Sequence, residues 1–161
     1  MGKLSNEKVY CKEVYGIRSE KSIKLAEGDY YERHYVVLRH KLGTPNTYIE
    51  VKPDDWLMTV EPSEYAKEHG FDDRYDAATM NVNGGATYFG PAGWDKEDKR
   101  MYVGWDYGHC GDYDPSWPED RQQGAHKWTF MEIMMDVAHA YDGIMLDNDD
   151  HWAEMHGTVK M

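Results

Sequence analysis

The chain has few of the features that mark a secreted or membrane protein. Its only two cysteines, Cys11 and Cys110, lie far apart in the sequence and form no CxxC pair. A disulfide framework is therefore not expected, because so few cysteines are typical of a reducing compartment. No apolar run approaches the roughly 18 residues of a membrane span, and the first residues lack the apolar core of a signal peptide. We expect a cytoplasmic protein that binds no membrane.

Basic residues are also scarce. The chain has 18 Lys and Arg against 30 Asp and Glu, which gives a formal net charge of -12. Direct nucleic-acid binding through phosphates needs a basic surface, so it is not expected. An acidic surface suits a basic partner, or it serves only to keep the protein in solution. The 13 Tyr and 6 Trp far outnumber the 3 Phe. Their rings are amphipathic, so they suit a sheet with one solvent-exposed face or a recognition surface.

The length and the turn signals predict one domain built on two β-hairpins. At 161 residues the chain is most simply a single domain. Residues 34–40 and 47–51 are rich in β-branched and aromatic side chains and are separated by turn-forming residues. A second pair of aromatic runs, 86–89 and 101–105, flanks a charged connection that contains Gly and Pro.

The strongest local signal predicts a helix from about Phe130 to Asp142. Thr129 and Glu132 have the spacing of a capping box, in which each residue's side chain bonds the other's backbone amide. Gly143 stands where a left-handed C-cap glycine would end the helix.

Shorter helices are expected at 19–27 and 61–69, and a functional or mobile loop at 113–124. Together these elements predict an α+β fold. Its antiparallel sheet would have about four or five strands, built from the two hairpins, and the main C-terminal helix would pack on one face.

Much of the polar chemistry falls at one end of the second hairpin. If its strands pair antiparallel, the residues before the first strand lie beside those after the second. The candidate ligand-binding residues there are Asn83, Gly84, Gly85, Tyr88, Asp106, His109 and Asp112. The glycine amides would favour an anion, and Asp106 would orient His109 for acid–base catalysis. The alternative is that these residues only satisfy backbone groups at a turn.

An acidic tail from about residue 145 holds side chains of the kinds that bind metals: Asp147, Asp149 and His151. The run lacks the glycine and the final glutamate of an EF-hand loop, and the chain has no HExxH motif. We therefore expect a solvated and mobile tail, with no metal and no cofactor.

Two further groups are weaker candidates. Asp136 and His139 lie one turn apart on the main helix and either pair on a solvated face or join the hairpin site. Trp94 precedes a highly charged run, and a tryptophan exposed there would be a contact residue.

The hairpin motifs resemble those of a family of uncharacterised phage and prophage proteins. That family carries an HGGxTY run followed by a GFDCAHxGD run, and this chain has NGGATY at 83–88 and GWDYGHCGD at 104–112. The chain departs from the pattern at Asn83, where the family has His, and at Tyr107 and Gly108, where it has Cys and Ala. Asn83 therefore argues against a catalytic or metal-binding role at that position.

The resemblance, which covers about residues 34–112, implies a phage accessory protein in the cytoplasm of a bacterial host. Such proteins often act on the host, including its defence systems, although a shared family does not fix a function. The leading hypothesis is a non-enzymatic inhibitor of host defence that binds a small anionic, nucleotide-like ligand or a host protein. The alternatives are a small hydrolase that uses the His109 and Asp106 pair, and an acidic mimic of nucleic acid. A homodimer is left open.

Overall fold

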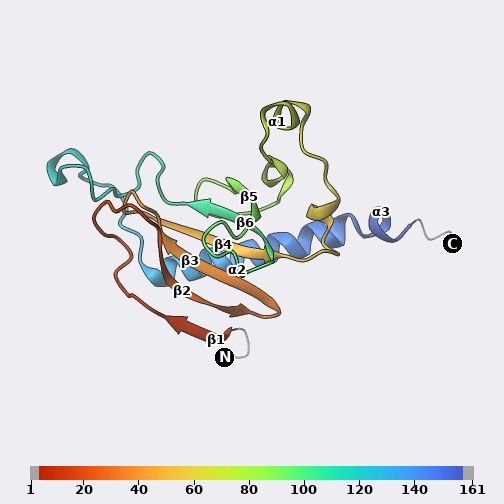
Figure 1. Ribbon diagram of the computed structural model, residues 1–161, viewed down its shortest axis with the longest axis horizontal. Helices are drawn as coiled ribbons and strands as arrows, with labels where there is room; N and C mark the ends of the chain where they lie inside the picture. The colour runs from red at the N-terminus through yellow and green to blue at the C-terminus, as the bar shows by residue number, and fades with distance from the viewer. Residues whose placement is uncertain (1–3, 158–161) are drawn as a thin grey trace.

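In the computed structural model, which describes residues 4–157, six strands form one antiparallel sheet with the order β1-β2-β3-β4-β6-β5 (Figure 1). The strands are β1 (Leu4–Val9), β2 (Ile23–Tyr30), β3 (Arg33–Arg39), β4 (Pro45–Val51), β5 (Tyr88–Pro91) and β6 (Met101–Asp106).

The two predicted hairpins are confirmed as β3–β4 and β5–β6. Tyr35 pairs with Ile49 in the first hairpin, and Phe89 pairs with Val103 in the second. The hairpins join edge to edge because β6 pairs with β4, with Ile49 opposite Val103. One sheet therefore connects the two hairpins, and the predicted α+β class is confirmed.

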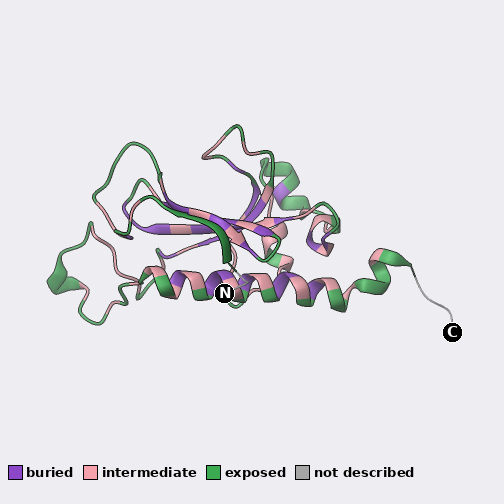
Figure 2. Cartoon of the chain, turned by 90° about the horizontal axis from the view of Figure 1, so that it is seen from below, coloured by how far each residue is buried: buried purple, intermediate pink, exposed green. Residues whose placement is uncertain are grey.

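The main helix, α2 (Phe130–Asp150), runs along one face of the sheet (Figure 2). Its capping box is formed as predicted, since Glu132 N donates to Thr129 Oγ1 at 3.2 Å and Thr129 N donates to Glu132 Oε1 at 2.9 Å. Four side chains at helical spacing face the sheet and are fully buried or nearly so: Ile133, Val137, Ala140 and Ile144. They pack on a core that includes Ile49 and Trp105, and this burial of apolar surface is what holds the helix to the sheet.

The helix predicted at 19–27 is wrong, because much of that segment belongs to strand β2. A β-bulge between Lys24 and Ala26 shifts the pairing with β3. Leu25 and Ala26 are consequently both buried, although they are adjacent in the chain. A bulge of this kind removes the alternation by which a strand is recognised in a sequence. Strand β1 was also missed, since all six of its residues are exposed and carry no apolar pattern.

Helix α2 is longer than predicted and does not end at Gly143. Residues 145–150, which were expected to begin the acidic tail, continue the helix. Gly143 is a packing residue, because a Cβ atom built there would lie 1.8 Å from the carbonyl oxygen of Thr79. Its missing side chain lets the loop before β5 cross the helix in direct contact with its backbone.

The remaining helices are short. They are η1 (Trp56–Thr59), α1 (Glu64–His69), η2 (Arg74–Ala77), η3 (Glu119–Arg121) and α3 (Trp152–His156). Helix α1 confirms the helix predicted near 61–69, with Ser63 as its N-cap and Gly70 in the left-handed region as its C-cap. Within residues 4–157, no helix combines the length and apolar character needed to cross a bilayer.

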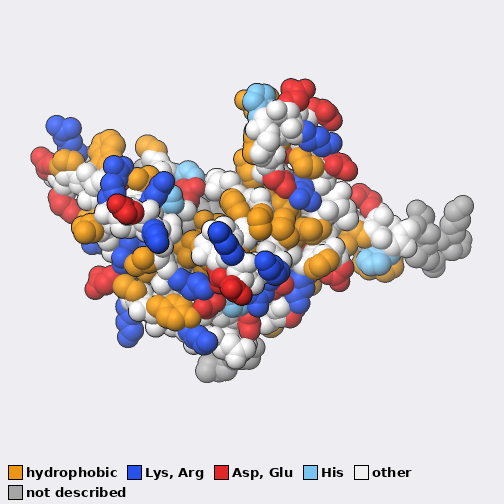
Figure 3. Space-filling model, viewed as in Figure 1, with side chains coloured by type: hydrophobic (Ala, Val, Ile, Leu, Met, Phe, Trp, Pro, Cys, Tyr) orange, Lys and Arg blue, Asp and Glu red, His pale blue; other side chains and the backbone are white. Residues whose placement is uncertain are grey.

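The face of the sheet opposite α2 (Figure 2) carries a smaller apolar cluster, which includes Val36, Leu38 and Tyr102. Apolar, acidic and basic side chains mingle on this side of the molecule (Figure 3). Trp94 packs here rather than extending into solvent, with its ring centroid 4.4 Å from that of Tyr48 and 5.0 Å from that of Tyr102. The charged run after Trp94 thus folds back, and Asp98 accepts a hydrogen bond from Tyr102 at 2.6 Å.

Candidate functional site

The two ends of the β5–β6 hairpin meet as the antiparallel pairing predicts. Asn83, before β5, donates from Nδ2 to Asp112 Oδ2 at 2.8 Å and to the backbone oxygen of Asp106 at 3.4 Å. Thr87 Oγ1 donates to Asp106 Oδ2 at 3.1 Å. Residues 19 to 29 positions apart are therefore joined by side-chain hydrogen bonds at this end of the sheet.

Asp112 organises this end of the hairpin. Its carboxylate accepts hydrogen bonds from Asn83 Nδ2, from the backbone amide of His109 at 2.9 Å and from Trp128 Nε1 at 2.8 Å. Only 7% of the Asp112 side chain is exposed. Three donors satisfy a nearly buried carboxylate, so Asp112 is a structural anchor rather than a group that is free to bind a ligand.

The imidazole of His109 lies over Gly84 and between two carboxylates. A Cβ atom built at Gly84 would come within 2.3 Å of the ring, so only glycine leaves room for it. His109 Nδ1 lies 3.5 Å from Asp106 Oδ1 and 3.6 Å from Asp112 Oδ2. These separations suit an ion pair but exceed those of a good hydrogen bond. Among the described residues, the buried Nδ1 atom has no hydrogen-bond partner.

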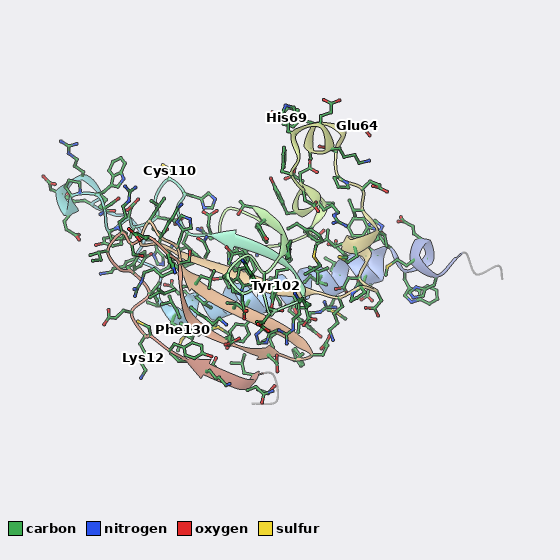
Figure 4. The ribbon with its side chains drawn as sticks, viewed as in Figure 1. Lys12, Glu64, His69, Tyr102, Cys110 and Phe130 are labelled. Atoms are coloured by element: carbon green, nitrogen blue, oxygen red, sulfur yellow. The ribbon has the colours of Figure 1, made fainter. Side chains whose placement is uncertain are left out.

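A hollow of about 570 Å³ opens beside His109, between the segment that follows β6 and the loop at 113–124. Its walls include His109, Cys110, Trp117, Arg121 and Gln123. We call this space the His109 hollow. Cys110 is exposed on the loop beyond β6 (Figure 4). The size of the hollow suits a small organic molecule.

The loop that closes the hollow is held by internal hydrogen bonds. Gln122 Nε2 donates to the backbone oxygens of Asp114 and Trp117, at 2.8 and 3.1 Å, and Gln122 Oε1 accepts from Asp114 N at 2.9 Å. Asp114 also accepts from the backbone amide and the hydroxyl of Ser116. The polar groups of Asp114 and Gln122 are therefore occupied, whereas Arg121 makes no ion pair within the described part of the chain.

A buried network ties the hairpin end to α2. Trp105 Nε1 donates to the Tyr107 hydroxyl at 2.9 Å, and that hydroxyl donates to Asp136 Oδ2 at 2.7 Å. Burial and the hydrogen bond to Asp136 both raise the pKa of Tyr107, so the hydroxyl stays a neutral donor. Asp136 is itself buried and lies 3.6 Å from His139 Nδ1. Of the two alternatives for this pair, Asp136 joins the hairpin end through Tyr107, while His139 beside it is exposed.

Three of the other predicted site residues lie apart from the hollow or already have partners. The Gly85 amide donates to Val82 O at 3.0 Å, so it is used within a turn rather than left open for an anion. Gly84 is covered by the His109 ring. Tyr88 lines a separate hollow on the face of the sheet opposite α2, where its hydroxyl donates to the backbone oxygen of Pro91.

The weak metal candidates are not brought together. Asp147 is buried and accepts a hydrogen bond from Thr79 N at 3.0 Å. His151 stacks on Trp56 and pairs with Glu154 at 2.9 Å. Across residues 4–157, no three His, Cys, Asp or Glu side chains gather as a metal site requires.

Sequence reasoning did not identify Trp117, Arg121 and Trp128 as part of this region. The length of the loop at 113–124 was a signal, because long irregular segments inside compact domains are often functional. Within this loop, Trp117 and Arg121 were the residues to propose for ligand contact, because Trp and Arg are the residue types that most often contribute strongly to binding.

Comparison of the chain with protein-family models, with curated proteins and with solved structures finds no match.

Proposed function

We propose that this protein acts by binding a small anionic ligand with a planar ring, of the nucleotide type, in the His109 hollow. The observation that carries the proposal is that Trp117, Arg121 and His109 wall the same hollow. Trp117 is 57% exposed and offers a ring face for stacking. Arg121 offers a guanidinium group, which recognises phosphate and carboxylate groups in a bidentate manner.

The charges around the hollow are compatible with an anion despite the acidic composition of the chain. Asp112 is nearly buried and saturated by three donors, and Asp114 is engaged within its own loop. Their charge is partly compensated by these hydrogen bonds. The unpaired guanidinium of Arg121 is then the strongest charge available to a ligand in the hollow.

The test is calorimetric titration with ATP, ADP, AMP, adenosine and inorganic phosphate. We expect the nucleotides to bind more tightly than adenosine or phosphate alone, because a nucleotide can both stack its base on Trp117 and place its phosphate against Arg121. Arg121→Gln should weaken nucleotide binding about tenfold, which corresponds to about 1.4 kcal/mol. Trp117→Ala should cost about 1–3 kcal/mol, as base stacking usually does.

Two matched controls separate the hollow from general effects of charge and exposed aromatic surface. Arg18→Gln removes an exposed positive charge outside the hollow, and Trp152→Ala removes a comparably exposed ring on α3. Neither should change the affinity. The proposal fails if no nucleotide binds, or if the control variants weaken binding as much as the hollow variants do.

The biological setting proposed for this activity is a phage-infected bacterium. It rests on the likeness of NGGATY and GWDYGHCGD to the motifs of phage and prophage proteins. A protein that sequesters a nucleotide signal would act as an inhibitor of host defence. Expression of the chain in bacteria that carry a nucleotide-signalled defence system should then restore phage growth, and Arg121→Gln should abolish the effect.

A hydrolase is the second candidate, and the placement of His109 favours it. Its Nδ1 atom lies 3.5 Å from Asp106 and 3.6 Å from Asp112. Such long contacts often tighten when a ligand binds, and either carboxylate would then orient the ring so that its other nitrogen can take a proton. If the bound nucleotide is hydrolysed, turnover should be lost in His109→Gln while binding persists. If the unaltered protein binds the nucleotide but does not hydrolyse it, the hydrolase is excluded and the proposed binding function stands.

A further inference from the structure

The outer surface of α2 carries a row of exposed residues, three of them large and apolar, that no other segment of residues 4–157 covers. Helix α2 has exposed residues spaced three or four apart on the face that points away from the sheet (Figure 2). They are Met131, Met135, His139, Asp142, Leu146 and Asp149, which we call the outer stripe. Met131 is 75% exposed, Met135 56% and Leu146 48%. Met131 and Met135 lie one turn apart, and Leu146 lies about three turns further on, beyond His139 and Asp142. Large apolar side chains this exposed on one helix face are typical of a contact surface.

A hollow of about 620 Å³ adjoins the outer stripe. It is walled by Met135, His139 and Asp142 of the stripe, together with Tyr30, Tyr31 and Tyr141. Tyr31 stacks on Tyr141 with ring centroids 4.9 Å apart, and it has a positive φ of 53°, which a residue with a side chain rarely adopts. The stripe thus has a shallow, open hollow next to it, against which an apolar side chain of a partner could pack.

The charge of α2 is of one sign only. Between Phe130 and Asp150 the chain has six Asp and Glu residues and no Lys or Arg. Asp149 and Asp150 stand in the last turn, where the partial negative charge of the helix end makes acidic side chains unfavourable. Glu32, which accepts a hydrogen bond from Tyr141, adds another carboxylate beside the hollow. The surface around the stripe therefore combines apolar side chains with the exposed carboxylates of Asp142, Asp149 and Asp150, whereas Glu32 is paired with Arg33 at 3.7 Å.

We infer that the outer stripe of α2 binds a basic amphipathic helix of a partner protein. Methionine side chains are flexible and polarisable, and they recur on surfaces that accept apolar helix faces. The apolar side chains of the partner would cover Met131, Met135 and Leu146 and enter the adjoining hollow. Its Lys and Arg residues would meet Asp142, Asp149 and Asp150. A second copy of this chain fits poorly, because pairing two α2 helices would bring acidic residues together with no basic residue from either helix.

The inference is independent of the ligand proposed for the His109 hollow, since the two surfaces share no lining residue. The probe is a leucine–lysine peptide of about 18 residues, with its leucines at helical spacing on one face. Fluorescence anisotropy of the labelled peptide, titrated with the full chain, should show saturable binding that weakens as salt is added. A scrambled peptide of the same composition and a leucine–glutamate peptide of the same pattern should not bind.

The variants distinguish the stripe from general acidity. The double variant Met131→Ser with Met135→Ser should weaken binding of the peptide at least tenfold. Ile17→Ser should not, because Ile17 is 87% exposed but lies outside the outer stripe. Asp142→Asn with Asp149→Asn should reduce both the affinity and its salt dependence, unlike Glu68→Gln on α1. All of these residues are exposed, so circular dichroism should show unchanged folding.

Three results of the peptide titration would overturn the inference. They are an absence of saturable peptide binding, equal binding of the scrambled peptide, and binding that the methionine variants leave unchanged. Light scattering that shows a dimer lost in Met131→Ser with Met135→Ser would also overturn it, because the stripe would then be covered by a second copy.

Discussion

His109 and Gly84 form one unit, since the imidazole occupies the space that a side chain at position 84 would fill. Gly84→Ala should displace the ring and weaken nucleotide binding about tenfold, as measured by calorimetry. Gly85→Ala is the matched control. Both glycines have a positive φ, 69° and 79°, but nothing lies within 4 Å of a Cβ atom at Gly85. If the two variants lose equal affinity, backbone strain rather than the position of His109 is responsible.

Gly143→Ala should destabilise the protein, although alanine is the better helix former by about 1 kcal/mol. The new methyl group would collide with the carbonyl of Thr79, which belongs to backbone and cannot swing aside. We expect the free energy of unfolding to fall by about 2 kcal/mol or more in urea titrations. Gly93→Ala, where the added atom meets nothing within 4 Å, should stay within about 0.5 kcal/mol of the parent. A Gly143→Ala protein as stable as the parent would contradict the observed contact.

Acid should weaken the fold through Glu27. Burial opposes its ionisation, but hydrogen bonds from Tyr10, His34 and Lys24 outweigh that effect and lower its pKa to about 2. An unfolded glutamate titrates near pH 4.3. The stabilisation is therefore complete above about pH 5 and is lost as the pH falls toward 2.

Glu27→Gln should lower the free energy of unfolding by about 1–2 kcal/mol at neutral pH, and the difference from the parent should shrink in acid. Urea titrations at a series of pH values measure this. Glu64→Gln, at a side chain that is 86% exposed, should leave the curve unchanged. A constant difference between Glu27→Gln and the parent at every pH would show that titration of Glu27 is not the cause.

Tyr107→Phe should cost about 2–3 kcal/mol of stability, because it leaves Asp136 and the Trp105 indole without the hydroxyl that joins them. Tyr113→Phe removes a hydroxyl–carboxylate bond of similar length, 2.8 Å to Glu119, from an exposed position. It should change the free energy of unfolding by less than about 0.5 kcal/mol. Similar losses in the two variants would mean that burial of the network contributes little.

The sequence was informative where local chemistry decides the structure. The start of α2 depends on Thr129 and Glu132, which contact each other directly, and the predicted capping box is confirmed. The two predicted hairpins are also confirmed, since β-branched and aromatic runs around a turn or a loop containing Gly and Pro specify each of them locally. The meeting of Asn83 with Asp112 followed from antiparallel pairing alone.

Contacts between distant segments could not be read from the sequence. Gly143 looks like a helix end, and only its contact with Thr79 makes it a packing residue. Arg121 reaches the hollow because Asp112 and His126 form a bridge that closes the loop between them. Strand β2 was missed because its bulge interrupts the alternation of apolar and polar side chains that is typical of a strand.

The strand order also sets the sequence of events by which the chain can fold. Strands β1 to β4 pair with their neighbours in the chain, so a four-stranded meander can form early from contacts of low sequence separation. Strand β6 must close on β4 across residues 52–100, and loop-closure entropy makes that step slower. During synthesis the outer edge of β4 therefore stays unpaired until β6 has emerged from the ribosome, and this interval is when a neighbouring nascent chain could pair with it.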